Sequence, residues 1–182
     1  GGDTVSLRGP RVLTLTALGR DAAAPVRSGA KPGDMLWVTG TIGDARLGLA
    51  IAMGADGPEG LRDAYRRPQP RLDEGRALGP IVHAMMDVSD GLLLDCARMC
   101  DASGVTIDLA PASVAIAAPE HRRADALRWG DDYALLFTIS PGLQPPVPAV
   151  RIGEVLPRGD AALLLDGTPP ADDTPLGYLH RA

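Results

Sequence analysis

Two aspartates lie three residues apart where an apolar run gives way to a helical pattern. The run 81–86 leads into Asp87-Val88-Ser89-Asp90-Gly91, and the helical pattern begins directly after the glycine. Mg²⁺ prefers carboxylate oxygens as ligands, and the first-turn N–H groups of a helix attract phosphate oxygens. This turn therefore indicates a site for Mg²⁺ and a phosphate. The alternative is that Asp90 only caps the helix and Asp87 only ends the strand, because such turns are common in α/β proteins.

A second acidic turn, Gly130-Asp131-Asp132-Tyr133, precedes the apolar run 134–139. Glycine lets the backbone approach a ligand closely, so this turn and Asp3, which follows a glycine pair, are further candidate ligand positions. The sequence contains no P-loop, no dinucleotide-binding glycine pattern and no nucleophile elbow around a serine. The three histidines share no metal-ligand spacing. The acidic turns are therefore the main candidates for chemistry.

Hydrophobic periodicity predicts the strands and helices that position these turns. The expected strands are 11–18, 35–39, 81–86, 105–109, 134–139, 150–155 and 161–165. The expected helices are 44–53, 61–67, 71–85 and 91–102. Residues 119–128 are expected to form a short charged helix or a turn. The pattern leaves open where the helix 71–85 ends and the next strand begins, and it places His83 in the helix.

The helix 91–102 is expected to be amphipathic. Its apolar face is formed by four residues at helical spacing: Leu92, Cys96, Met99 and Cys100. Its charged residues are expected on other faces: Asp95, Arg98 and Asp101. The chain has no third cysteine to complete a metal site, so both cysteines are expected to be buried, reduced thiols.

The composition limits the class of protein and its partners. The 182 residues fit one domain, or one domain plus a fragment of another. A formal net charge of −5 argues against a nucleic-acid partner, because that binding needs a basic surface. No apolar run approaches the roughly 18–20 residues that span a bilayer, and no signal peptide opens the sequence. We therefore expect no membrane partner and a cytoplasmic location.

Five segments, in a fixed order, closely resemble the thiamine-monophosphate kinases. These segments are 1–4, 27–34, 65–71, 87–92 and 130–138. That family belongs to the superfamily of aminoimidazole ribonucleotide synthetase, selenophosphate synthetase and the hydrogenase-maturation dehydratase. The resemblance covers essentially the whole chain and corresponds to the C-terminal portion of the family's sequence. It implies that residues 1–25 are a remnant of an N-terminal ATP-binding domain and that residues 26–182 form a C-terminal α/β domain.

The resemblance also implies the fold and the assembly. The fold class is α/β (α+β), a layered sandwich of helices on a mixed β-sheet, like the C-terminal domain of aminoimidazole ribonucleotide synthetase, with one N-terminal remnant strand. A homodimer is implied for the full-length parent. The isolated chain is expected to lack kinase activity, because the family's N-terminal half carries part of the metal cluster.

The activity that the resemblance implies is the ATP- and Mg²⁺-dependent phosphorylation of thiamine monophosphate to thiamine diphosphate. No residue is assigned as an acid or base, since metal-assisted charge neutralisation and positioning supply most of such a phosphoryl transfer. The implied ATP-binding residues are Gly2, Asp3, Arg27 and Ser89. The implied Mg²⁺ ligands are Asp3, Asp87 and Asp90, and the implied substrate-binding residues are Asp131 and Tyr178.

The chain departs from the family pattern at its second acidic turn. Trp129 stands where the family has a glycine, and Asp131 and Ala134 stand where it has glutamates. These changes bear on how the substrate fits. Two alternatives therefore remain: another ATP-dependent member of the superfamily, and a non-catalytic domain that binds a phosphorylated ligand, which the loss of the carboxylate at Ala134 favours.

Overall fold

The computed structural model describes residues 9, 15, 16, 18, 24–171 and 173–179. Most of the expected strand 11–18 and most of the expected remnant 1–25 lie outside the described residues. No described helix is long and apolar enough to cross a bilayer.

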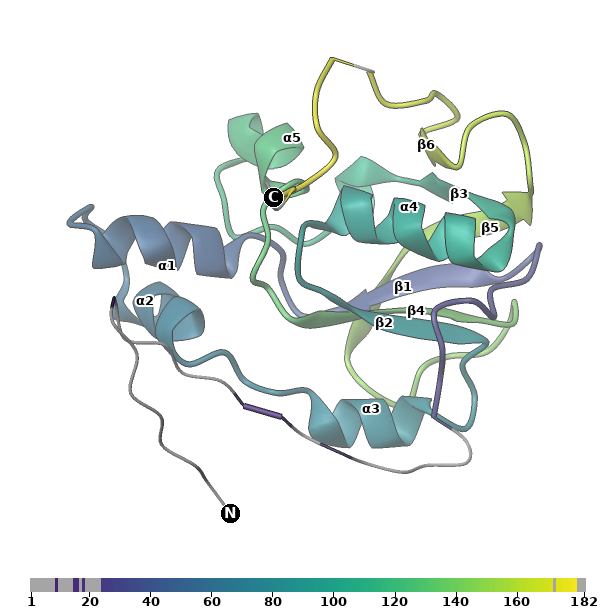
Figure 1. Cartoon of the computed structure of the whole chain (residues 1–182), viewed down its shortest axis with the longest axis horizontal. Coiled ribbons are helices and arrows are strands. Elements are labelled where there is room, and N and C mark those ends of the chain that lie inside the picture. The colour runs from purple at the N-terminus through teal and green to yellow at the C-terminus, as the bar shows by residue number, and fades with distance from the viewer. Residues whose placement is uncertain (1–8, 10–14, 17, 19–23, 172, 180–182) are drawn as a thin grey trace.

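One mixed β-sheet forms the centre of the described chain (Figure 1). Its strands are β1 (Met35–Thr39), β2 (Ala84–Val88), β3 (Val105–Leu109), β4 (Ala134–Ile139), β5 (Ala149–Pro157) and β6 (Leu163–Leu165). Their order across the sheet is β2-β4-β1-β5-β3-β6. Neighbours pair antiparallel except β3 and β6, which are parallel. The strands expected at 35–39, 105–109 and 134–139 are confirmed at the same residues.

Five α-helices are described, with two short 3₁₀ turns at Pro111–Ser113 and Glu120–Arg122. The helices are α1 (Asp44–Ala52), α2 (Glu59–Arg66), α3 (Leu72–Leu78), α4 (Leu92–Ser103) and α5 (Arg123–Ala126). Figure 1 shows α4 on one side of the sheet and α3 on the other, with α1 and α2 packed together beside one end. The predicted sandwich of helices on a mixed sheet is confirmed.

Alternation along the strands gives the sheet two buried faces. The face under α4 takes residues such as Leu36, Val38 and Leu136, with Cys96 and Met99 from the helix. The other face, covered by α3, is a smaller cluster: Trp37, Leu78, Phe137 and Ile139. Both cysteines of α4 are buried and unpaired, which confirms that prediction.

The expected helix 71–85 is wrong in its second half. Helix α3 ends at Leu78, and the next residues are Gly79 and Pro80, of which proline has no N–H to continue the helix. His83 is therefore not helical. Its backbone N–H donates to the Thr138 carbonyl across 2.9 Å, and its Nδ1 lies 2.9 Å from Oδ1 of the buried Asp34.

Candidate functional site

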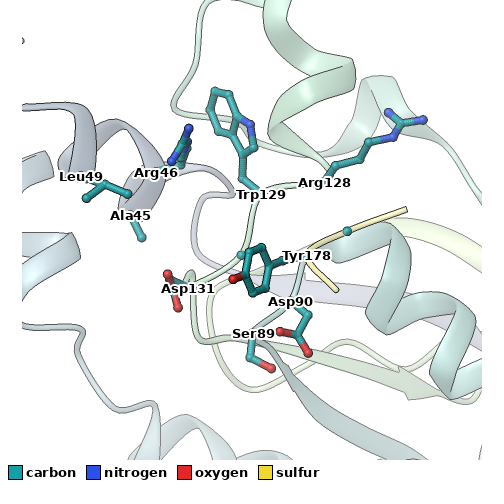
Figure 2. Close-up of a pocket in the computed structure, with 11 residues that line it drawn as sticks. Ala45, Arg46, Leu49, Ser89, Asp90, Arg128, Trp129, Asp131 and Tyr178 are labelled. Atoms are coloured by element: carbon teal, nitrogen blue, oxygen red, sulfur yellow. The ribbon is translucent and has the colours of Figure 1, made fainter. Parts of the chain in front are cut away.

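A cavity of about 650 Å³ opens beside the N-terminal end of α4 (Figure 2). Four residues that the sequence singled out line this cavity: Ser89, Asp90, Asp131 and Tyr178. The other lining residues come from α1, from the loop after α5 and from the C-terminal segment: Ala45, Arg46, Leu49, Arg128, Trp129, Gly130 and Gly177. Segments far apart in the sequence thus converge on the turn between β2 and α4.

Backbone hydrogen bonds hold these segments on the turn. The Asp131 N–H donates to the Ser89 carbonyl across 2.9 Å, and the Tyr178 N–H donates to the Asp90 carbonyl across 2.7 Å. Asp131 has a φ of 68°, a left-handed conformation that costs a non-glycine residue roughly 1–2 kcal/mol. The hydrogen bond to Ser89 helps to hold Asp131 in that conformation beside the cavity.

Three glycines allow the backbones to approach closely enough. A Cβ on Gly91 would lie 2.6 Å from the Arg128 carbonyl oxygen, and one on Gly130 would lie 2.5 Å from the Ser89 carbonyl oxygen. A Cβ on Gly177 would lie 2.3 Å from the Asp90 carbonyl oxygen. Any side chain at these positions would push the cavity walls apart, so each glycine is needed for the geometry rather than for flexibility.

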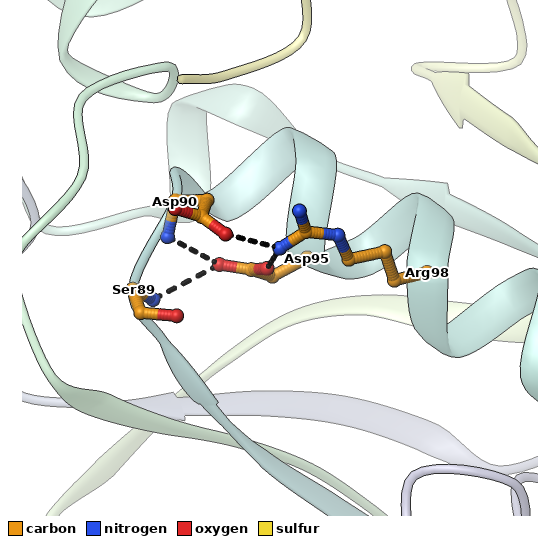
Figure 3. Close-up of polar contacts among 4 residues, drawn as sticks. All are labelled: Ser89, Asp90, Asp95 and Arg98. Atoms are coloured by element: carbon orange, nitrogen blue, oxygen red, sulfur yellow. Dashed lines mark hydrogen bonds and ion pairs between the residues drawn. The ribbon is translucent and has the colours of Figure 1, made fainter. Parts of the chain in front are cut away.

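Asp95 shapes the turn from inside the core (Figure 3). Its Oδ2 accepts hydrogen bonds from the backbone N–H groups of Ser89, at 3.0 Å, and Asp90, at 3.1 Å. Arg98 donates to Oδ1 of Asp95 across 2.8 Å and to Oδ2 of Asp90 across 2.5 Å. Burial raises the pKa of Asp95, and its hydrogen bonds to the Asp90 N–H and to Arg98 oppose that rise.

Two sequence expectations are corrected at this turn. Asp90 does not cap α4: the N-cap residue is Gly91, and no side chain makes a capping hydrogen bond there among the described residues. The carboxylate of Asp90 is held by Arg98 instead. Asp95 was expected away from the apolar face, but it is 0% exposed. Its spacing from Leu92 and Met99 puts it on the core face. Both of its carboxylate oxygens accept hydrogen bonds, and a buried polar group is tolerated when it has such partners.

The second acidic turn joins the cavity to α1. Both carboxylate oxygens of Asp132 lie 2.9 Å from the backbone N of Gly43, the N-cap residue of α1. Burial raises the pKa of Asp132 to about 7, and the charges of Asp44 and Asp131 add to the rise. Hydrogen bonds from the backbone N–H groups of Gly43 and Ala45 oppose it. Asp132 therefore fixes α1, and with it the cavity wall, to the turn before β4.

Several nearby carboxylates affect the pKa of Tyr133, the aromatic residue of this turn. Burial raises its pKa, and the charges of Asp131, Asp87 and Asp90 raise it further. Its hydroxyl lies 3.3 Å from Oδ1 of Asp131. Tyr133 thus lies in the electrostatic field of both acidic turns, which are separated by more than 40 residues in the sequence.

The remaining sequence candidates lie elsewhere. Asp87 is exposed on the same face of β2 as Met85, opposite the core under α4. Arg27 lies at the far end of α4, where its carbonyl accepts from the Ser103 hydroxyl across 3.0 Å, and a helix of 12 residues is roughly 18 Å long. Gly2 and Asp3 are outside the described residues. The structure therefore does not bring Asp87 or Arg27 into the cavity lining.

The carboxylates of the described residues can be compared with the ligands that Mg²⁺ requires. The described part of the chain contains no group of three or more His, Cys, Asp or Glu side chains that could hold a metal. Mg²⁺ usually takes one or two carboxylates and completes its shell with water and substrate phosphates. Asp87 and Asp90 fit that ion in ligand chemistry, as a partial set to be shared with phosphates.

Sequence reasoning missed Arg46 as a cavity residue, and it singled out Trp129 only as a departure from the family pattern that bears on how the substrate fits. Arg46 comes from α1. Long-range contacts such as that of Gly43 with Asp132 hold this helix beside the cavity, and no local pattern signals them. The sequence signal for Trp129 was a tryptophan beside the acidic turn 130–133, where the family has a glycine.

Comparisons with known proteins agree with the fold and the motifs. Residues 31–166 match the family model for AIR synthase related protein, C-terminal domain. The thiamine-monophosphate kinase of Escherichia coli (strain K12) is 41% identical over 157 residues, which are 76% of this chain and 47% of that protein. The chain spans about half the length of the curated relatives it matches.

Two solved structures are similar over most of the chain. The thiamine-monophosphate kinase of Stenotrophomonas maltophilia K279a has a TM-score of 0.73 and 31% sequence identity, covering 82% of this chain and 55% of that one. AaThiL complexed with AMPPCP and TMP has a TM-score of 0.71 and 27% identity, covering 84% of this chain and 53% of that one.

Proposed function

Because the chain belongs to the family of AIR synthase related protein, C-terminal domain, we propose that it is the C-terminal, substrate-binding portion of a thiamine-monophosphate kinase. The reaction is transfer of a phosphoryl group from ATP to thiamine monophosphate, giving thiamine diphosphate. The observation that carries the proposal is the single cavity that joins the Ser89–Asp90 turn with Asp131 and Tyr178. The names of the relatives that share its sequence support it.

The chemistry of the cavity suits this substrate. Thiamine monophosphate has a cationic thiazolium ring, a neutral aminopyrimidine ring and a phosphate. The exposed carboxylate of Asp131 attracts the cation, and so does the face of an aromatic ring such as that of Tyr178. The positive end of the α4 dipole favours a phosphate near Ser89 and Asp90.

Mg²⁺ and ATP are part of the proposal. Asp87 and Asp90 would hold Mg²⁺ together with Asp3, and the ion would neutralise charge where donor and acceptor phosphates meet. Ser89 would contact ATP, together with Arg27 and the Gly2–Asp3 backbone. Arg98 already holds one oxygen of Asp90, which fixes the direction in which that carboxylate points.

The domain division and the assembly follow from the same proposal. Residues 26–182 form the substrate-binding domain, and residues 1–25 belong to an ATP-binding domain. The match of residues 31–166 to a C-terminal domain family supports that division. The full-length parent is a cytoplasmic homodimer in this proposal.

The test is calorimetric titration of the 182-residue chain with thiamine monophosphate, with and without Mg·ATP, together with an assay of turnover. We expect binding that weakens in Asp131→Asn and is unchanged in the control Asp63→Asn, which alters an exposed carboxylate on α2. We expect no turnover by the chain alone, because its relatives are about twice as long. Ordinary turnover would contradict the assignment to one portion of the enzyme, and absence of binding would contradict the substrate.

A non-catalytic domain that binds a phosphorylated ligand is the second candidate. The observation that favours it is Ala134, which is buried at the start of β4 and offers no carboxylate beside the acidic turn. In that case the affinity for thiamine monophosphate would not change when Mg·ATP is added, whereas the kinase proposal expects the two ligands to affect each other's binding.

A further inference from the structure

Trp129 lines the cavity at the end of α5, where its backbone N–H donates to the Ala126 carbonyl across 3.1 Å. In Figure 2 its indole points away from the ring of Tyr178, which lies below it in this view. The family pattern assigns no role to a tryptophan at this position. The question is whether the indole packs the helices together or receives a ligand.

A charged side chain that does not line the cavity covers one face of the indole. The guanidinium of Arg122 lies 4.9 Å from the ring centroid, and Arg122 is itself paired with Asp125 across 3.0 Å. Arg122 is not among the residues that line the cavity. Arg122 therefore occupies one face of the ring from outside the cavity lining.

A glycine on α1 makes room for the ring. Gly43 packs against the indole so closely that a Cβ there would lie 3.2 Å from Cε3 of Trp129 and 3.4 Å from Cβ of Ala126. With Arg122 over the ring and Gly43 at its edge, the indole has little freedom to reorient. A ring already fixed in the binding orientation loses less entropy when a ligand stacks on it.

We propose that Trp129 is the stacking platform for a neutral aromatic ring of the ligand, which in the proposed substrate is the aminopyrimidine. The positive charge of Arg122 makes the indole less attractive to a second cation, and a neutral ring is free of that repulsion. The exposed carboxylate of Asp131 gives the cationic ring a better place beside Tyr178. This inference rests on the proposed function. It assigns the neutral aminopyrimidine ring to Trp129 and the cationic thiazolium ring to Asp131 and Tyr178.

Two variants and two ligands test the platform in the 182-residue chain. Trp129→Leu removes the ring and keeps an apolar side chain, whereas Trp129→Phe keeps a ring that can stack. The ligands are thiamine monophosphate and the corresponding N-methylthiazolium phosphate, which lacks the pyrimidine and keeps the positive charge of the thiazolium ring. Calorimetry is expected to show that Trp129→Leu weakens the binding of thiamine monophosphate about 10-fold and that Trp129→Phe retains most of the affinity. Both variants are expected to bind the N-methylthiazolium phosphate like the wild type.

Tryptophan fluorescence gives an independent measurement. The chain has two tryptophans, and Trp37 is buried in the cluster under α3, on the face of the sheet away from α4. Thiamine monophosphate is expected to quench the wild-type emission and to leave that of Trp129→Phe unchanged, although this variant still binds.

The outcomes separate this inference from the proposed function. If Trp129→Leu binds thiamine monophosphate as tightly as the wild type, or loses equal affinity for both ligands, the platform is overturned while the substrate assignment stands. If the wild type does not bind thiamine monophosphate at all, the proposed function and the platform are overturned together.

Discussion

The buried carboxylate of Asp95 accepts a hydrogen bond from the backbone N–H of Asp90 across 3.1 Å. The same oxygen accepts from Ser89, and Arg98 joins the carboxylates of Asp95 and Asp90. A residue inside α4 therefore sets the path of the turn that precedes the helix. The two residues of that turn which line the cavity owe their position to a charge in the core.

Replacing Asp95 by alanine is expected to destabilise the fold. Two backbone N–H groups lose their acceptor, and each buried donor left unpaired costs about 1–3 kcal/mol. We expect the free energy of unfolding to fall by about 2–4 kcal/mol, measured by urea denaturation followed by circular dichroism. The control is Asp101→Asn on the same helix, whose partner Arg158 is exposed, with an expected change below about 1 kcal/mol. Equal effects of the two variants would contradict this account of Asp95.

Asp132 is expected to make stability depend on pH. Its folded-state pKa of about 7 is above the ordinary value of 3.8, so the folded state binds its proton more tightly than the unfolded state. This contribution to stability is fully present below the unfolded pKa and is lost as the pH rises through about 7. Asp132→Asn removes it, while the amide oxygen can still accept from Gly43.

The measurement is the difference in unfolding free energy between Asp132→Asn and the wild type at pH 4 and at pH 8. We expect this difference to shift by roughly 2–4 kcal/mol in favour of the variant at the higher pH. Asp56→Asn, in the exposed loop after α1, is the control and is expected to show no such shift. A difference for Asp132→Asn that does not change with pH would show that Asp132 titrates normally.

The sheet was largely predictable from the sequence because strand signals are local. Alternating or continuous apolar residues at 35–39, 105–109 and 134–139 already specify which residues extend. The helix 71–85 failed because periodicity alone continued past Gly79-Pro80 into β2. The order of strands and the parallel pairing of β3 with β6 depend on contacts between distant segments, which no local pattern encodes.

The site was predictable only as far as its motifs are local. Ser89, Asp90 and Asp131 stand out as glycine-flanked acidic turns, whereas Tyr178 depended on the family resemblance. Asp95 was missed because a charged residue at helical spacing is ordinarily solvent-facing, and its buried position follows from hydrogen bonds that form only in the folded chain. Trp129 gained its place in the cavity from packing on Gly43 of another element.

Cys96 and Cys100 are expected to resist thiol reagents in the native protein. Burial raises the pKa of the Cys96 thiol well above its usual range and that of Cys100 to about 11. Since the thiolate is the reactive form, the shift at Cys100 alone lowers its thiolate fraction about 100-fold at pH 8. Reaction with a chromogenic disulfide should release about two thiols per chain only after urea is added. Rapid reaction without denaturant would show that α4 detaches from the sheet.

Gly177→Ala is expected to weaken ligand binding more than it weakens the fold. A Cβ at this position would lie 2.3 Å from the Asp90 carbonyl oxygen and 2.7 Å from Cβ of Leu94, so the segment must move and the hydrogen bond from the Tyr178 N–H is lost. That segment lies outside the sheet. We therefore expect a change in unfolding free energy below about 1 kcal/mol, with thiamine monophosphate affinity reduced about 10-fold, or about 1.4 kcal/mol.

The matched control for this substitution is Gly60→Ala in α2, where a Cβ would meet nothing within 4 Å. Alanine is favoured over glycine inside a helix by roughly 0.5–1 kcal/mol, so this variant should be slightly more stable and bind like the wild type. Because both variants add one methyl group, a difference in calorimetric affinity between them reports the contact of Gly177 with Asp90. If Gly177→Ala keeps full affinity, Tyr178 does not form part of the binding site, since its ring could not stay in place once its backbone had moved.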